Sequence, residues 1–343
     1  MVMQGIDVRR ARATQRDLAD LDPIVPEQNP SAALAAQHPI EQVEARPWRG
    51  LWKSLRPHQW VKNAFVLAPL FFAKAYTDPL LSAKALAAAL LFSLAAGTVY
   101  LLNDLMDVER DREHPVKRYR PIASGLLPEA VAWRALVGIG AVAAVGSYVL
   151  APLFAAAVGT YLVMNLAYSM KLKHYAFVDV AIIATGFVLR VLAGAAAVSV
   201  VVSEWLVACT FLLALYLGLG KRRHELALYL SGSVERTRRV LDSYRLENVD
   251  FGMLVCSGLT TAAYTIYTLT ASLPDQPLRA VATPFASVWL PVTIPMVVVG
   301  LARFFQIVRR EDARSPTEMM LRDKPLVLNI GVWAAVMVVL SVL

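Results

Sequence analysis

The feature that most restricts how this chain can fold is its series of long apolar stretches. Nine of them are candidates for transmembrane helices, near residues 62–76, 80–102, 130–148, 151–169, 178–200, 205–220, 252–272, 282–304 and 325–342. A hydrocarbon core about 30 Å thick requires roughly 20 apolar residues per helix. The sequence therefore predicts an all-α polytopic membrane protein with about nine transmembrane helices, of which the 62–76 stretch gives the weakest signal.

The basic residues are concentrated in every second connection between these stretches. The connections after the second, fourth, sixth and eighth stretches contain most of the Lys and Arg, and the opposite connections are nearly bare. Because basic loops stay in the cytoplasm, this asymmetry predicts a multi-pass protein of the inner (plasma) membrane with a cytoplasmic N-terminus and an outside C-terminus. The same loops account for the formal net charge of +8, so we expect no nucleic-acid partner.

The N-terminal segment differs in composition from the rest of the chain. Residues 1–46 mix Ala, Gln, Pro and charges of both signs without apolar periodicity, which predicts a disordered cytoplasmic tail. From Trp48 onward, tryptophan and leucine recur at helical spacing among basic residues, a pattern that suits an amphipathic helix at the membrane interface. We therefore expect a single transmembrane domain over residues 47–343.

Three aspartates follow the second apolar stretch, at positions 104, 107 and 111, directly after Asn103. On a continuous α-helix, Asp107 and Asp111 lie about 60° and about 20° from the direction of Asp104, so all three project from one face. Such carboxylates repel each other unless a cation lies among them. Mg²⁺ accepts hard oxygen ligands and keeps positions open for substrate phosphates. The motif therefore predicts a catalytic Mg²⁺ site with a phosphorylated substrate.

This motif and the basic loop after it resemble the first signature of the UbiA superfamily of intramembrane prenyltransferases. That signature reads N-D-x-x-D-x-x-x-D, followed by a basic loop that ends in R-P-x-x-x-G. The residues that fit it position by position are Asn103, Asp104, Asp107, Asp111, Arg120, Pro121 and Gly125. The resemblance implies a UbiA-type helix bundle, a cytoplasmic active site, and Asn103 with the three aspartates as catalytic and metal-binding residues.

The region after the sixth stretch departs from the usual pattern of that superfamily. Ordinary members hold Mg²⁺ between the first Asp-rich motif and a second one at this place, whereas this chain has G-K-R-R-H-E-L at residues 220–226. Bases in place of acids provide fewer metal ligands and more sites for anionic oxygens. This block resembles the decaprenyl-phosphate phosphoribosyltransferase branch, as do residues 56–63, 168–174, 315–318 and 321–326.

Membership of that branch implies transfer of 5-phosphoribose from phosphoribosyl pyrophosphate to decaprenyl (polyprenyl) phosphate, for the synthesis of cell-wall arabinan precursors. Pyrophosphate is released, and a Mg²⁺ ion at the aspartates would neutralise it as it leaves. Lys171 and Lys173, near Tyr168, are interpreted as ligands of a donor or acceptor phosphate, and Lys221 with Arg222 as ligands of the 5-phosphate. The full set of candidate substrate-binding residues is Gln59, Lys62, Asn63, Lys117, Arg118, Arg120, Tyr168, Lys171, Lys173, Lys221, Arg222 and Glu225.

Two other functions remain open from the sequence. An aromatic prenyltransferase that uses prenyl diphosphate would keep the first motif, but the second Asp-rich motif is missing. A transporter would place charge along a conduit, and here the polar clusters lie in loops on one side.

Arg190 is an exception, because it lies well inside the fifth apolar stretch. A central Arg costs about 2.5–3.5 kcal/mol on insertion scales, so we expect a buried pairing for it, with Asp179 earlier in the same stretch. A homo-oligomer is possible.

Overall fold

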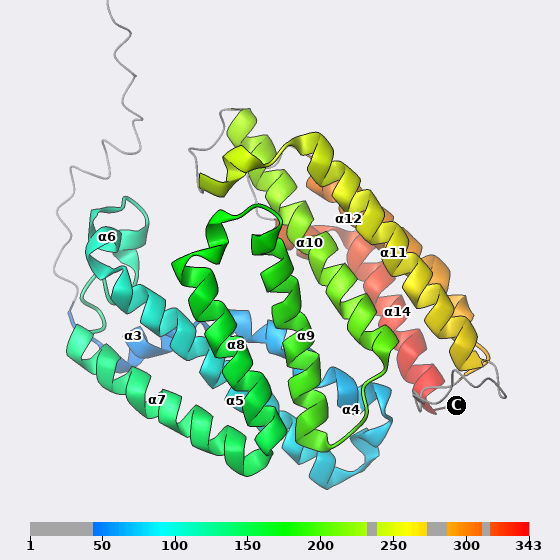
Figure 1. The fold of residues 1–343 in the computed structure, drawn as a ribbon, viewed down its shortest axis with the longest axis horizontal. Coiled ribbons are helices and arrows are strands. Elements are labelled where there is room, and N and C mark those ends of the chain that lie inside the picture. The colour runs from blue at the N-terminus through cyan, green and yellow to red at the C-terminus, as the bar shows by residue number, and fades with distance from the viewer. Residues whose placement is uncertain (1–43, 232–238, 273–286, 311–315, 343) are drawn as a thin grey trace, which may run out of the picture.

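The computed structural model describes residues 44–231, 239–272, 287–310 and 316–342, and the regular elements in these residues are all helices (Figure 1). The long helices are α5 (Pro79–Met106), α7 (Glu129–Leu150), α8 (Pro152–Met170), α9 (Val178–Val198), α10 (Glu204–Leu230), α11 (Leu246–Ser272), α12 (Ile294–Val308) and α14 (Lys324–Val342). The shorter α-helices are α3 (Pro47–Ser54), α4 (Ala68–Phe72), α6 (Val108–Glu113) and α13 (Pro316–Arg322). The 3₁₀ helices are η1 (Pro57–Val66), η2 (Ala75–Thr77), η3 (Lys117–Tyr119), η4 (Leu172–His174), η5 (Arg239–Ser243) and η7 (Leu290–Thr293).

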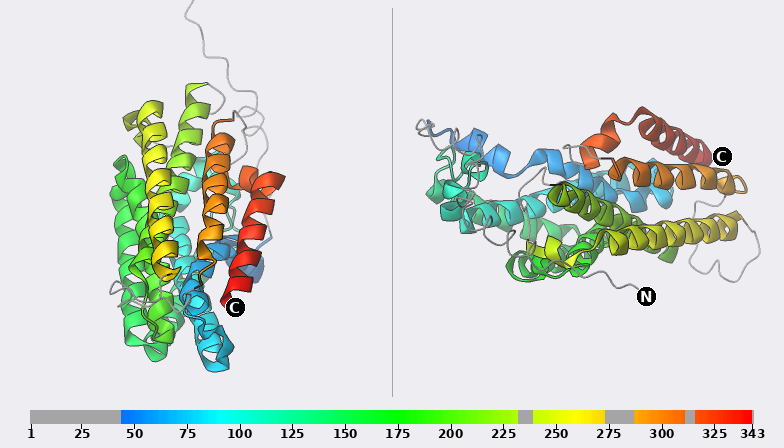
Figure 2. Two further views of the ribbon diagram at one scale, coloured as in Figure 1. Left: turned by 90° about the vertical axis from the view of Figure 1, so that its right-hand side faces the viewer. Right: turned by 90° about the horizontal axis from the view of Figure 1, so that it is seen from above.

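The protein is a multi-pass membrane protein. Within the described residues, eight helices are long and apolar enough to cross a membrane, and η7 continues into α12 as one of them. They run side by side along one common direction (Figure 2). α5 packs against α7, α8 and α9, while α10 packs against both α9 and α11. The all-helical polytopic fold expected from the apolar stretches is confirmed.

The 62–76 stretch, the weakest of the nine candidates, does not form one long helix. The chain between α3 and α5 is divided into η1, α4 and η2. α4 begins at Ala68, and Pro69 in its first turn has no backbone N–H to donate, so η1 does not continue into α4 as one helix. The divided segment still leads from one end of the bundle to the other, because Arg56 contacts Asp104 near the end of α5, whereas Asp78 caps the start of α5.

The central helix α5 shows why these residues form this bundle. The Asp78 carboxylate accepts hydrogen bonds from the backbone N–H groups of Leu80 (2.7 Å) and Leu81 (3.2 Å), which fixes the first turn. Small side chains occupy much of the buried face and let neighbouring helices approach closely; they are Ala85, Ala88, Ala95, Ala96 and Gly97. α5 therefore serves as the axis around which α7, α8 and α9 pack.

The polar loops gather at one end of the bundle. The C-terminal end of α5 with α6, the loop between α8 and α9, and the C-terminal end of α10 all lie at the upper end in Figure 1, and the C-terminus lies at the lower end. α3 forms where an interfacial helix was expected, and Trp48 and Trp52 on it are exposed. The predicted disordered tail falls almost wholly outside the described residues.

Candidate active site

Two of the three aspartates are buried and share a basic partner. Asp104 and Asp111 are only 2% and 1% exposed. Nη1 of Arg120 donates to Oδ1 of Asp104 (3.1 Å) and to Oδ2 of Asp111 (2.7 Å). Nη2 of Arg56 donates to the same Oδ1 of Asp104 (2.8 Å). Each buried carboxylate thus has the cationic partner that a charge removed from water requires.

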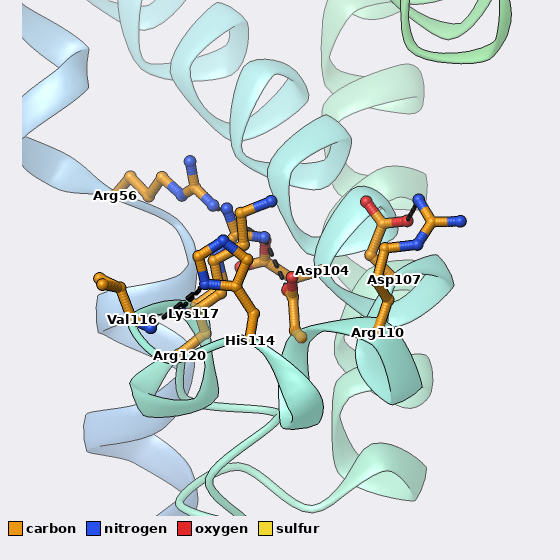
Figure 3. Close-up of polar contacts among 9 residues, drawn as sticks. Arg56, Asp104, Asp107, Arg110, His114, Val116, Lys117 and Arg120 are labelled. Atoms are coloured by element: carbon orange, nitrogen blue, oxygen red, sulfur yellow. Dashed lines mark hydrogen bonds and ion pairs between the residues drawn. The ribbon is translucent and has the colours of Figure 1, made fainter. Parts of the chain in front are cut away.

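Asp107 does not join this pair. The helix breaks at Asp107, which ends α5 with φ −101° and ψ 7°, so the expectation of one continuous helical face for the three aspartates is wrong. Its carboxylate is 43% exposed and lies 3.6 Å from Arg110. Figure 3 shows Asp107 beside Arg110, apart from Asp104 and Arg120. Within the described residues, no three His, Cys, Asp or Glu side chains gather closely enough to hold a metal ion.

The donor set nevertheless suits a divalent cation. The guanidinium of Arg120 lies between the two buried carboxylates, in the place that a bound cation could take. Asn103 and Asp107 lie in the same turn, and their side-chain oxygens add to the hard ligands available. These residues fit Mg²⁺ if Arg120 gives up one of its two carboxylates and the exposed side chain of Asp107 turns from Arg110 towards Asp104.

The start of η1 brings a second group of candidate residues to this end of the bundle. Nζ of Lys62 donates to Oε1 of Gln59 (2.6 Å), and Asn63 is buried behind them. The Lys62 side chain is solvent-accessible, but desolvation by the surrounding protein, together with the positive charges of Lys221 and Arg190, lowers its pKa to about 8. Lys62 from η1 and Lys221 from α10 therefore lie within electrostatic range of each other.

Behind Lys62 lies a buried polar network around Arg190. Its Nε donates to Oδ1 of Asn63 (2.8 Å), its Nη2 to the hydroxyl of Tyr161 (3.1 Å), and its Nη1 to the carbonyl of Gly186 (2.8 Å). Nδ2 of Asn63 donates to the hydroxyl of Ser93 (2.9 Å). The expected buried pairing of Arg190 therefore exists, but its partners are neutral oxygens and not Asp179.

The basic block on α10 is divided between an accessible lysine and a buried arginine. Lys221 is half-exposed, and its Nζ lies 4.0 Å from Glu225. Arg222 is 1% exposed, forms an ion pair with Glu225, and its Nε lies 3.4 Å from Oδ2 of the buried Asp179. The structure therefore gives Lys221 access to a ligand, while the charge of Arg222 is occupied by two carboxylates.

The remaining candidates lie in the loops around this group. Tyr168 and Lys173 are half-buried and Lys171 is exposed, around the junction of α8 and η4. Lys117 and Arg118 are half-buried on η3, where Nη2 of Arg118 donates to the hydroxyl of Tyr119 (3.0 Å). All of the candidate residues thus lie at or near the polar end of the bundle.

The structure adds Arg56 and Tyr100 to the residues identified from the sequence. The guanidinium of Arg56 lies 4.8 Å from the centre of the Tyr100 ring. The backbone of Arg56 is in the left-handed region, with φ 51°. Tyr100 is one helical turn before Asp104, a spacing that could have placed it on the same face. The sequence could also have indicated Arg56, because this residue is the first of the block at residues 56–63 and precedes a proline.

An apolar cavity of about 450 Å³ lies next to this polar group, between α4, α10, α11, α12 and α14. Its wall begins one turn beyond Lys62 and one turn before Lys221, at Phe65 and Leu217. It continues to the opposite end of the bundle; residues that line it along its length include Phe72, Cys209, Phe304 and Trp333. The cavity therefore has room for a long apolar chain whose polar head stays at the polar end of the bundle.

Comparisons with known proteins agree with these observations. The model of the UbiA prenyltransferase family matches residues 64–329. The decaprenyl-phosphate phosphoribosyltransferase of Mycobacterium tuberculosis is 34% identical over 306 residues, which are 86% of this chain and 95% of that protein. The enzyme of the same name from Corynebacterium glutamicum is 31% identical over 295 residues, 83% of this chain and 84% of that protein.

The fold is also that of solved UbiA structures. A UbiA homolog from Archaeoglobus fulgidus, bound to GPP and Mg²⁺, superposes with a TM-score of 0.60 at 16% identity, over 85% of this chain and 98% of that one. A digeranylgeranylglyceryl phosphate synthase superposes with a TM-score of 0.61 at 14% identity, over 86% and 98%. At such identities the likeness concerns the fold alone.

Proposed function

This chain belongs to the UbiA prenyltransferase family, and on that premise we propose that it transfers 5-phosphoribose from phosphoribosyl pyrophosphate to decaprenyl or another polyprenyl phosphate. The observation that carries the proposal is the contact of Arg56 and Arg120 with the buried Asp104, at the end of the bundle where Lys62 and Lys221 lie within electrostatic range of each other. Two cations at this place suit a donor with several phosphates. The relatives named decaprenyl-phosphate phosphoribosyltransferase support the same assignment.

The aspartate segment would bind the pyrophosphate end of the donor. Asn103, Asp104, Asp107 and Asp111 would hold Mg²⁺, which when bound would neutralise the charge that develops on the leaving pyrophosphate. Arg120 already contacts Asp104 and Asp111, so its guanidinium is within reach of the same phosphates. No covalent nucleophile is required, because the acceptor phosphate is itself an anion that can attack the ribosyl carbon.

The basic side chains would offset the repulsion between the two anionic substrates. Lys62 and Lys221 would bind the 5-phosphate end of the donor, and Lys171 with Lys173 would bind the acceptor phosphate. The prenyl tail of the acceptor would lie in the apolar cavity that starts at Phe65. The product would be a polyprenyl-phosphoryl-ribose 5-phosphate that serves as an arabinosyl precursor for the cell wall.

The orientation in the plasma membrane follows from the positive charge at the polar end of the bundle. Basic side chains there include those of the aspartate segment, the α8–α9 loop and the end of α10. We assign this end to the cytoplasm by the positive-inside rule, which puts the end of α14 on the outside. Phosphoribosyl pyrophosphate, a soluble metabolite, would then reach the site directly.

The reaction can be tested with purified protein in detergent or nanodiscs. We expect Mg²⁺, phosphoribosyl pyrophosphate and decaprenyl phosphate to give one pyrophosphate per lipid phosphate consumed, together with an acid-labile phosphoribosyl lipid identified by mass spectrometry. A chelator should stop the reaction. Formation of a prenylated aromatic ring from prenyl diphosphate, with no phosphoribosyl lipid, would contradict the proposal and would favour an aromatic prenyltransferase.

A further inference from the structure

Arg190 lies in the interior of the bundle without an acidic partner among the described residues. It is 6% exposed and occupies the middle of α9, a helix that is apolar over most of its length. Asp179, on the same helix, is about 16 Å away along the axis and is engaged by Arg222. Because a charge in this position is costly, its retention calls for a function that a neutral residue would not fulfil.

The contacts of Arg190 are made by three different elements. Asn63 comes from η1, Tyr161 from α8 and Gly186 from α9 itself. The guanidinium also lies 5.1 Å from the ring of Phe92 and 4.8 Å from that of Tyr161. Hydrogen bonds and rings hold the group in one place, and none of these partners neutralises its charge.

η1 is anchored to α9 at two successive turns. Asn63 contacts Arg190, and Val66 lies directly on Gly194, where an added Cβ atom would come within 1.9 Å of the Val66 carbonyl oxygen. Lys62 is the residue before Asn63, so the position of its side chain depends on this anchor. The charged and titratable groups that face Lys62 are Lys221 from α10 and Arg190 from α9, and on α5 Tyr100 and Asp104 are turned towards Arg56.

We propose that Arg190 is a positioning residue for the anionic donor: it fixes Asn63, and with it the Lys62 end of η1, and it supplies a positive charge behind Lys62 that no acidic side chain in the described part of the chain cancels. This inference rests on the proposed function. Arg190 itself lies behind η1 and is not proposed to contact the substrate. Its charge favours an anion in front of Lys62, and it also makes Lys62 easier to deprotonate.

The charge and the hydrogen bonds of Arg190 can be separated by two substitutions. Arg190→Gln keeps a polar side chain and removes the charge, whereas Arg190→Lys keeps the charge and loses the forked hydrogen bonds. The KM for phosphoribosyl pyrophosphate and kcat should be measured from about pH 6.5 to pH 9.5, with pyrophosphate binding followed by calorimetry over the same range.

In the wild-type protein, donor affinity should fall as pH rises through the pKa of Lys62. With Arg190→Gln the affinity should be at least about tenfold lower, because the charge-assisted hydrogen bond that fixes Asn63 is lost. The midpoint of the pH dependence should move to higher pH. Arg190→Lys should lower the affinity without moving the midpoint. Both effects should appear mainly in KM.

Arg223→Gln is the matched control. Arg223 is also a buried arginine on a long helix, but it contacts Asp250 and the carbonyl of Val308, away from η1. The substitution Arg223→Gln should lower the melting temperature and leave the midpoint of the pH dependence of donor affinity unchanged. An unchanged midpoint and KM in Arg190→Gln would overturn the proposal. If that variant does not fold, wild-type donor affinity in Arg190→Lys would overturn the positioning role.

Failure of the proposed phosphoribosyl transfer can be distinguished from failure of the inference about Arg190. If the wild-type protein formed no phosphoribosyl lipid, the proposed function would fail, and the pH dependence of pyrophosphate binding would still test the role of Arg190. If the wild-type protein were active and pyrophosphate binding did not respond to either substitution, the inference about Arg190 alone would fail.

Discussion

At the scale of single residues, Asp104 and Asp107 are held in different ways, and this difference separates stability from catalysis. Asp104 is buried and accepts hydrogen bonds from Arg56 and Arg120, whereas Asp107 is 43% exposed with Arg110 at 3.6 Å. Removing the charge of Asp104 leaves two guanidinium groups less well paired in a partly buried site. Removing that of Asp107 disturbs an exposed ion pair of little energetic value.

We therefore expect Asp107→Asn to lower turnover by about 100-fold or more, as for loss of one group that stabilises transition-state charge, with an unchanged melting temperature. Asp104→Asn should lower both turnover and stability, the latter by roughly 1–3 kcal/mol. The rate at which the proposed phosphoribosyl lipid forms measures turnover, and thermal unfolding in detergent measures stability. Glu109→Gln, an exposed change in the same segment, should affect neither quantity. Near wild-type turnover in Asp107→Asn at saturating Mg²⁺ would remove Asp107 from the proposed metal site.

The two neighbouring bases on α10 allow a second comparison. Lys221→Ala should raise the donor KM by an amount equivalent to about 1.5–3 kcal/mol, the value of a charge-assisted hydrogen bond, with little change in stability. Arg222→Ala should mainly reduce the yield of folded protein, because Asp179 and Glu225 would lose their shared partner. Steady-state kinetics and size-exclusion profiles measure these outcomes. A selective rise in acceptor KM for Lys221→Ala would instead assign this position to the lipid phosphate.

The sequence identified most polar residues at this end of the bundle but not their partners. Spacing placed Asp104 and Asp111 together correctly, because the chain continues as a helix on both sides of the break. It could not place Asp107, since a helix break depends on how the following loop packs. The pairing of Arg222 with Asp179 joins two separate helices, and a pattern along one chain contains no information about such contacts.

At the scale of elements, the approach of η1 to α9 depends on Gly194. A Cβ atom at this position would lie 1.9 Å from the Val66 carbonyl oxygen, so Gly194→Ala must move η1 away from α9. Because Asn63 and Lys62 lie on the same element, we expect a loss of stability and a higher donor KM. Gly159→Ala in α8 is the control: it has open space around it and should be neutral or slightly stabilising by helix propensity. Equal melting temperatures and KM values in both variants would show that η1 is not constrained here.

Tyr244, the residue that follows η5, holds the loop between α8 and α9. The Tyr244 hydroxyl donates to Asp179 and accepts from the backbone N–H of Phe177 (2.7 Å), a residue with a left-handed φ of 64°. Tyr244→Phe leaves the Phe177 N–H without this acceptor and removes the hydroxyl donor from Asp179, which should cost about 1–3 kcal/mol. Hydrogen exchange in residues 171–177 should become faster, while Tyr175→Phe, a change at an exposed ring, should leave it unchanged. Unaltered exchange in Tyr244→Phe would mean that other contacts hold the loop.

Most helix positions could be predicted at this scale, since apolar length alone defines a transmembrane helix. α10 extends about ten residues beyond the expected end at residue 220, because its basic residues find acidic partners within the protein. The 62–76 stretch does not form one helix, because its apolar residues are too few to outweigh the polar Lys62 and Asn63 and the helix-breaking Pro69.

At the scale of the whole molecule, the apolar cavity connects the polar end of the bundle to its opposite end. Its wall includes Leu217 near Lys221 and Cys209 further along α10, the latter about 18 Å from Lys221 along the helix axis. A polyprenyl chain that enters the cavity from the polar end of the bundle would pass Leu217 first and reach Cys209 only if it is long. The cavity thus relates the length of the acceptor to its affinity, at up to about 0.8 kcal/mol per buried CH₂ group.

Cys209→Phe should therefore weaken the binding of decaprenyl phosphate much more than that of a prenyl phosphate with two isoprene units. The shorter tail ends before it reaches Cys209. The donor KM should not change, because the substituted side chain is far from the aspartates and from Lys221. Val207→Phe introduces the same ring on another face of α10, outside the lining of this cavity, and should leave both acceptors unaffected. Acceptor KM values for the two chain lengths measure the effect. If Cys209→Phe weakened the binding of both acceptors equally, or of neither, the prenyl tail would have to bind elsewhere, while the proposal of a donor site at the aspartates would be unaffected.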